Sequence, residues 1–211
     1  MKKKTIIILF LIILVVFLIY IKTRDNSVYY VNLTDEHIEY YGSKYSNYIV
    51  EELERKDKLE KFIEFQYDDY RITDLINSIR ENDYIYVDEK KQTIQNALIK
   101  ADLLTIHMGK NDIDYGLIKN NKEDIYNYLD TLLIDFETLL EEVRKYTKEQ
   151  IMLIGFYTLD NQKQEYIEYF NQKMEKLCEE KKISFISVSN KDLENISLKL
   201  KDDILAKFTF S

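Results

Sequence analysis

Short apolar runs alternate with longer amphipathic segments along most of the chain. Five runs rich in β-branched and aromatic residues predict strands, and they cover Val28 to Leu33, Leu59 to Phe65, Ala101 to Met108, Gln150 to Tyr157 and Ile183 to Val188. Apolar residues at three- and four-residue spacing predict helices between them, over Lys44 to Lys56, Ile72 to Arg80, Gln92 to Lys100, Lys122 to Tyr146 and Gln162 to Lys181. This alternation predicts an α/β fold, a three-layer α/β/α sandwich whose five-stranded parallel sheet is covered on both faces.

A Gly-x-Asn-Asp turn follows the third predicted strand. The chain has only four glycines and no proline, so a glycine between an apolar strand and Asn111-Asp112 indicates a tight turn at Gly109. Ligands of parallel α/β proteins bind beyond the carboxyl ends of the strands. The turn is therefore the first candidate for a functional site.

The first 21 residues differ from the rest of the chain. Three lysines precede Thr5, and the stretch from Ile6 to Ile21 contains no charged residue before Lys22 and Arg24. As a helix this stretch is roughly 24 Å long, and flanking lysines that snorkel can extend it toward a ~30 Å hydrocarbon core. We expect a membrane anchor that leaves the N-terminus in the cytoplasm, because positive charge is greater before the segment than after it.

A cleaved signal peptide is the competing interpretation of this segment. No Ala-x-Ala-like cleavage site follows Ile21, and the only cysteine is Cys178, so no lipid-attachment site lies near the segment. An uncleaved signal anchor is therefore favoured. The expected organisation is a basic tail over residues 1–4, a transmembrane anchor over 5–21, a short stalk over 22–27 and one extracytoplasmic domain over 28–211, single-pass in the cell membrane.

Composition limits the partners of the outer domain. The single cysteine excludes an internal disulfide. Five of the 30 Lys and Arg residues precede Asp25, which leaves 25 against all 38 Asp and Glu residues, a formal charge of −13. That field repels anionic polymers, so neither nucleic acid nor an anionic membrane surface is expected as a partner, unless a local basic patch binds one.

Several segments resemble blocks of the SGNH hydrolase family, the GDSL-type esterases and lipases. Val31-Asn-Leu-Thr34 resembles the Asp-Ser-Leu-Thr block, with Gly42 and Tyr48 following, and Tyr70 to Leu75 resembles the second block. Gly109-Lys-Asn-Asp112 matches the third block and is preceded by the usual Ala-Asp and an apolar strand. The segments Ile154 to Tyr157 and Tyr169 to Met174 also resemble the bacterial branch of the family. The resemblance covers roughly Val28 to Val188 and implies a flavodoxin-like sheet with an ester-cleaving site.

Three departures from the family concern its catalytic groups. The aligned nucleophile position holds Asn32, and a carboxamide cannot act as that nucleophile. The only histidines are His37 and His107, and the C-terminal Asp-x-x-His block is missing. The second-block glycine of the oxyanion hole falls near Asp69, where a carboxylate would repel a developing oxyanion. Only Asn111 keeps its expected place, and the resemblance therefore implies a degenerate esterase site.

The candidate ligand-binding residues are those that surround this degenerate site: Asn32, Asp69, His107, Gly109, Asn111 and Asp112. An Asn-Asp pair after a strand also caps helices and closes turns, so binding and capping both stay open for Asn111. A lone histidine on an apolar strand is more often a packed residue, which we favour for His107. No cysteine and carboxylate cluster accompanies the two histidines, so we expect neither a metal nor a cofactor.

Two classes of function follow. The favoured one is a non-catalytic, membrane-anchored domain that binds an envelope ligand or a protein partner. The alternative is an active esterase or acyl-transfer enzyme with a relocated nucleophile, Ser43 or Ser46, and His37 or His107 as its base. A third possibility is a truncated gene product whose last residues, Lys201 to Ser211, form an orphaned helix and tail.

Overall fold

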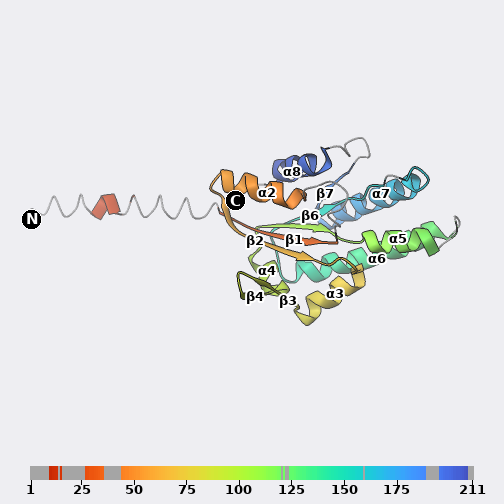
Figure 1. Cartoon of the computed structure of the whole chain (residues 1–211), viewed down its shortest axis with the longest axis horizontal. Coiled ribbons are helices and arrows are strands. Elements are labelled where there is room, and N and C mark those ends of the chain that lie inside the picture. Colours follow the sequence, from red (N-terminus) through yellow and green to blue (C-terminus); the bar gives the residue numbers. More distant parts are fainter. Residues whose placement is uncertain are drawn as a thin grey trace, which may run out of the picture.

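A parallel five-stranded sheet forms the centre of the computed structural model, which describes residues 10–13, 15, 27–35, 44–119, 121, 124–158, 160–188 and 195–208 (Figure 1). Its strands lie in the order β2-β1-β5-β6-β7. They are β1 (Val28–Thr34), β2 (Leu59–Gln66), β5 (Leu103–His107), β6 (Gln150–Ile154) and β7 (Ser184–Ile186). The predicted α/β fold with five parallel strands is confirmed, although β6 and β7 are shorter than expected.

Helices cover both faces of this sheet. In Figure 1, α2 (Tyr45–Arg55) and α8 (Ile196–Lys207) lie above it, and α3 (Ile72–Glu81), α4 (Ile94–Lys100) and α6 (Ile125–Arg144) lie below. The helix α7 (Gln164–Lys181) shares the lower core with α6. Because both faces are covered, all seven residues of β1 are buried. Alternate residues of β1 therefore enter two separate cores, with Tyr29 in the lower one and Tyr30 in the upper one.

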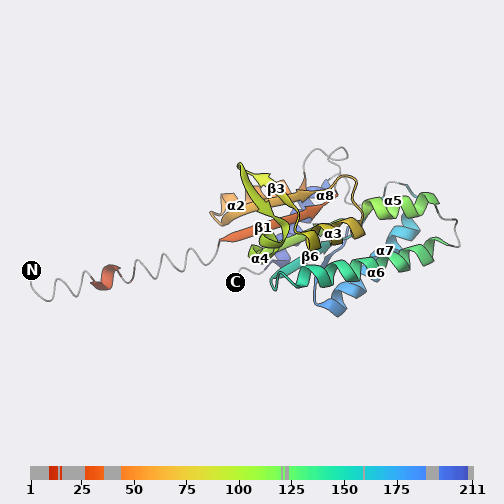
Figure 2. The same cartoon turned by 90° about the horizontal axis from the view of Figure 1, so that it is seen from below.

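Two elements were not expected from the sequence. A hairpin of β3 (Tyr84–Val87) and β4 (Lys90–Thr93) precedes α4, and its turn residues Asp88 and Glu89 both have positive φ, 50° and 62°. The short helix α5 (Lys110–Lys119) starts directly after the glycine turn. Figure 2 shows that α5 extends past the carboxyl ends of the strands, at the opposite end of the molecule from the start of β1.

The C-terminal helix differs from the expected orphaned segment. It starts at Ile196 instead of Lys201, and its buried residues Leu200 and Ile204 share one apolar cluster with Ile49 and Leu53 of α2. Helix α8 therefore forms part of the upper layer.

The predicted anchor falls largely outside the described residues. Within it only Phe10–Ile13 and Val15 are described, and these residues are helical and exposed. Across the described ranges, no helix combines the length and the apolar character that crossing a membrane requires. The anchor remains a prediction from the sequence.

Candidate functional site

The turn at Gly109 has a backbone conformation that glycine alone adopts readily. Its φ is +110°, and a Cβ placed there would lie 2.6 Å from Cζ of Phe136 and 3.3 Å from Cδ1 of Ile72. Phe136 is fully buried, so its ring has no room to move away. The expectation of a tight turn at Gly109 is confirmed, because both the torsion angle and the packing exclude a side chain.

Asp35 is the first residue after β1 and binds this turn. Its Oδ2 accepts hydrogen bonds from the backbone N–H of Gly109 (2.8 Å) and of Lys110 (2.9 Å), the first residue of α5. Burial raises the pKa of Asp35 above its usual range, although nearby His107 and the backbone donors oppose this effect. Its Oδ1 is buried and has no hydrogen-bond partner in the described part of the chain. Asp35 thus joins the carboxyl end of β1 to the start of α5.

Asn111 and Asp112 connect the same turn to the loop that follows β2. The Asn111 amide nitrogen donates to the backbone oxygens of Asp68 (2.9 Å) and Tyr70 (3.0 Å). Asp112 Oδ2 accepts from the backbone N–H of Ile72 (2.9 Å), the first residue of α3, and burial raises the pKa of Asp112 to about 6. Asp112 therefore accepts from the first backbone N–H of α3, whereas Asn111 donates to loop carbonyls and caps no helix through these contacts.

Asn32 lies within β1, two residues before its end at Thr34. Its backbone pairs with Glu64 of β2 on one side and Thr105 of β5 on the other. Its Oδ1 accepts from the hydroxyls of Tyr45 and Thr105, each at 2.7 Å, and its Nδ2 donates to Glu64 Oε1 at 2.9 Å. All three hydrogen-bonding contacts of this buried amide are internal.

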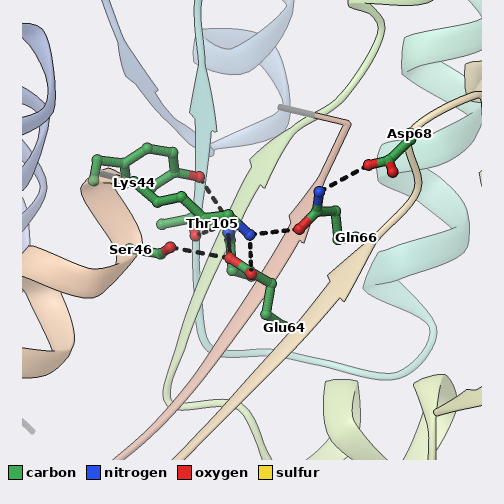
Figure 3. A network of polar contacts seen from close by, with 8 residues as sticks. Lys44, Ser46, Glu64, Gln66, Asp68 and Thr105 are labelled. Atoms are coloured by element: carbon green, nitrogen blue, oxygen red, sulfur yellow. Dashed lines mark hydrogen bonds and ion pairs between the residues drawn. The ribbon is translucent and has the colours of Figure 1, made fainter. Parts of the chain in front are cut away.

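Glu64 is the centre of a polar network that extends from Asn32 to the protein surface (Figure 3). Ser46 Oγ donates to Glu64 Oε1 at 3.0 Å, and Lys44 Nζ lies 2.5 Å from Glu64 Oε2. Lys44 also donates to Gln66, whose amide nitrogen donates to Asp68 at 2.8 Å. The side chains of Lys44 and Glu64 are only 10 % and 18 % exposed, so the ion pair is well shielded from solvent and closes the upper face of the sheet against α2.

His107 is the last residue of β5 and is buried. Its ring centroid lies 6.1 Å from that of Tyr45 and 6.1 Å from that of Phe156. The imidazole is thus packed between aromatic rings at the carboxyl edge of the sheet, close enough to Asp35 to affect the pKa of that carboxyl. This environment agrees with the packed-residue interpretation of His107.

Four further candidates remain: Asp69, His37, Ser43 and Ser46. Asp69 is exposed in the loop after β2. His37 and Ser43 lie outside the described residues. Ser46 is buried, and its hydroxyl donates to a carboxylate and not to an imidazole. Ser78, another buried serine, likewise donates to a carboxylate, that of Asp83.

Asp35, Lys44 and Glu64 were missed as site residues in the sequence. Asp35 directly follows the predicted strand, and a carboxylate at a strand's carboxyl end is a signal that could have identified it. Nothing local marks Lys44 and Glu64, because their contact joins residues 20 positions apart. No group of three His, Cys, Asp or Glu side chains in the described ranges could hold a metal ion.

Solved structures of hydrolases share this fold. An acetylxylan esterase from Geobacillus stearothermophilus superposes with a TM-score of 0.62 at 15 % identity, covering 86 % of this chain and 94 % of that one. A lipase from a goat rumen metagenome gives 0.63 at 18 % identity, covering 82 % and 96 %. Catalytic mutants of the esterase replace a serine, an aspartate or a histidine by alanine. No protein-family model and no curated protein matches the sequence, so the comparison establishes the fold alone.

Proposed function

We propose that this chain is a non-catalytic domain of the SGNH hydrolase fold, tethered to the cell membrane by residues 6–21 and acting outside it as a binding domain. One observation carries the proposal. The polar groups at the expected catalytic edge are used to hold the fold together, since Asp35 and Asp112 accept from helix starts and Asn111 donates to a loop. An esterase needs some of these groups available to its substrate.

The position of β1 supports a revised alignment of the first block. Since β1 ends at Thr34, an Asp-Ser pair directly after the strand aligns with Asp35-Glu36 instead of Val31-Asn32. In either alignment the serine is replaced, by Asn32 or by Glu36. The proposed loss of the nucleophile therefore does not depend on which alignment is correct.

The chemistry of the partner follows from charge. The domain carries a formal charge of −13 from Asp25 onward, which favours a neutral or cationic ligand at the cell envelope over an anionic polymer. A neutral sugar polymer or a basic protein surface meets this condition.

Ester hydrolysis by the purified full chain tests the proposal. We expect no turnover of p-nitrophenyl acetate or of an acetylated xylo-oligosaccharide above a heat-denatured control. A matched pair of variants, Ser46→Ala and Ser78→Ala, removes two buried serine hydroxyls, and only Ser46 donates to the network at Glu64. Turnover that survives purification, is lost in Ser46→Ala or His107→Ala and persists in Ser78→Ala would overturn the non-catalytic assignment and identify a relocated nucleophile.

A further inference from the structure

The parallel topology gathers one set of chain segments at the amino ends of the strands. Each helix that leads directly into a strand of the five-stranded sheet ends there, and so does the last helix. We call this surface the amino edge, and it comprises residues 55–58, 100–102, 144–149, 181–183 and 207–208. In Figure 1 this edge lies toward the left of the folded part, opposite α5, and the β3–β4 hairpin lies on the same side.

The amino edge differs in charge from the rest of the domain. Its five segments contain 10 Lys and Arg residues and only 3 Asp and Glu residues, a formal charge of +7. The adjoining residues 81–93, which include the β3–β4 hairpin on the same side, carry 4 acidic and 2 basic residues, so the two together are at +5. The domain as a whole is at −13, so the remainder carries −20. Basic residues in last helical turns are favoured by the helix dipole, but Lys58 and Lys148 lie beyond the helices. The dipole therefore accounts for only part of this asymmetry.

Three lysines of the amino edge have their charge available. Lys100, Lys148 and Lys182 are exposed, and none of them forms an ion pair with a described residue. Ile99, next to Lys100 on α4, is 62 % exposed. An apolar side chain beside free lysines suits a surface that meets lipid headgroups.

The chain enters the domain at this same edge. Val28, the first residue of β1, donates its backbone N–H to Lys58 O at 2.6 Å. Only residues 22–27 separate it from the apolar run that ends at Ile21. Fully extended, the seven Cα–Cα steps from Ile21 to Val28 reach no more than about 25 Å. If the apolar run is in the bilayer, the amino edge lies within that distance of it.

We infer that the amino edge lies against anionic lipid headgroups and orients the domain on the membrane. The inference rests on the tether in the proposed function, and charge complementarity selects the occupant, because the membrane-proximal edge is the basic one of an acidic domain. The acidic remainder is repelled by the same surface. The strand β1, with seven residues at about 3.3 Å each, then places the Asp35 and Gly109 turn roughly 20 Å farther out. The candidate site faces ligands of the envelope and not bilayer lipid.

Fluorescence quenching in vesicles tests this orientation with the full chain. Ile99→Cys and Ile118→Cys place a maleimide dye at the amino edge and on α5, where Ile118 is 73 % exposed. Burial raises the pKa of the native Cys178 thiol to about 12, so that residue stays unlabelled. The quencher is carried on a lipid headgroup, in vesicles of phosphatidylcholine alone or of equal parts phosphatidylcholine and phosphatidylglycerol.

We expect several-fold stronger quenching at position 99 than at 118 in the anionic vesicles, and a smaller difference in the neutral ones or in ~1 M salt, where the Debye length is about 3 Å. Lys100→Glu, Lys148→Glu and Lys182→Glu together should abolish the difference. The matched triple Lys110→Glu, Lys119→Glu and Lys163→Glu, at the opposite edge, should preserve it.

Each failure has its own meaning. A chain that does not float with the vesicles overturns the tether and this inference with it. A chain that floats, but shows equal quenching at both positions or no effect of the amino-edge triple, overturns the orientation alone.

Discussion

Replacing Gly109 with alanine should destabilise the fold because two separate costs arise at one residue. The φ of +110° lies where a Cβ is strained, at about 1 to 2 kcal/mol. The new Cβ would also lie 2.6 Å from the Phe136 ring, an overpacking that costs about 1 to 3 kcal/mol. Reduced freedom of the unfolded chain returns roughly 0.4 to 1 kcal/mol. The net loss is about 1 to 5 kcal/mol, a large share of the ~5 to 15 kcal/mol of a typical domain.

Urea unfolding, monitored by circular dichroism, measures this loss. The urea concentration at the midpoint should fall, while the dependence of the free energy of unfolding on urea concentration stays the same. The variant Phe136→Leu separates the two costs, because it removes the ring carbons that the alanine would contact. In that background Gly109→Ala should cost only the backbone strain less the unfolded-chain return, about 0 to 1.6 kcal/mol, which leaves a coupling energy of about 1 to 3 kcal/mol.

Two results would refute this reasoning. A loss below about 0.5 kcal/mol in both backgrounds would show that the turn adopts a conformation open to alanine. An equal loss in both backgrounds would show that contact with Phe136 is not a source of the cost.

Two further predictions concern buried carboxylates. Because burial raises the pKa of Asp112 to about 6, the native state retains a proton that the unfolded chain releases near pH 4. This contribution to the free energy of unfolding is complete below about pH 4 and is lost as the pH rises through 6. Urea unfolding across that range should therefore show a smaller decline in stability for Asp112→Asn than for the unmodified chain. An equal decline in both would contradict the prediction. Asn32→Asp would place a second carboxylate 2.9 Å from Glu64 Oε1 and should cost about 2 to 3 kcal/mol at neutral pH. The same unfolding assay should show recovery in acid, and an unaltered midpoint at neutral pH would exclude the bond between these side chains.

The network around Glu64 explains why an asparagine is stable in the middle of a sheet. A buried amide without partners would cost about 1 to 3 kcal/mol. Tyr45 and Thr105 donate to its oxygen and Glu64 accepts from its nitrogen, so its main hydrogen-bonding capacity is satisfied. Lys44 in turn compensates the Glu64 charge. The asparagine is therefore accounted for by packing of the sheet, without a ligand.

The sequence by itself determined the order of the main elements and the tight turn at Gly109. Apolar runs and helical spacing are local properties, so all five strands were located from the pattern alone. Helix α5 and the β3–β4 hairpin were missed because each is short, and short elements give weak periodicity.

Only the tertiary structure decided which polar residues meet. Asn32 lies within the predicted strand Val28 to Leu33, but only pairing with two neighbouring strands shows that β1 continues to Thr34 and that Asn32 is buried in the sheet. Asp35 was passed over, although its carboxylate binds a turn 74 residues later in the chain. Local pattern carries no information on such contacts, because strand register and the ends of strands are fixed by pairing between distant segments.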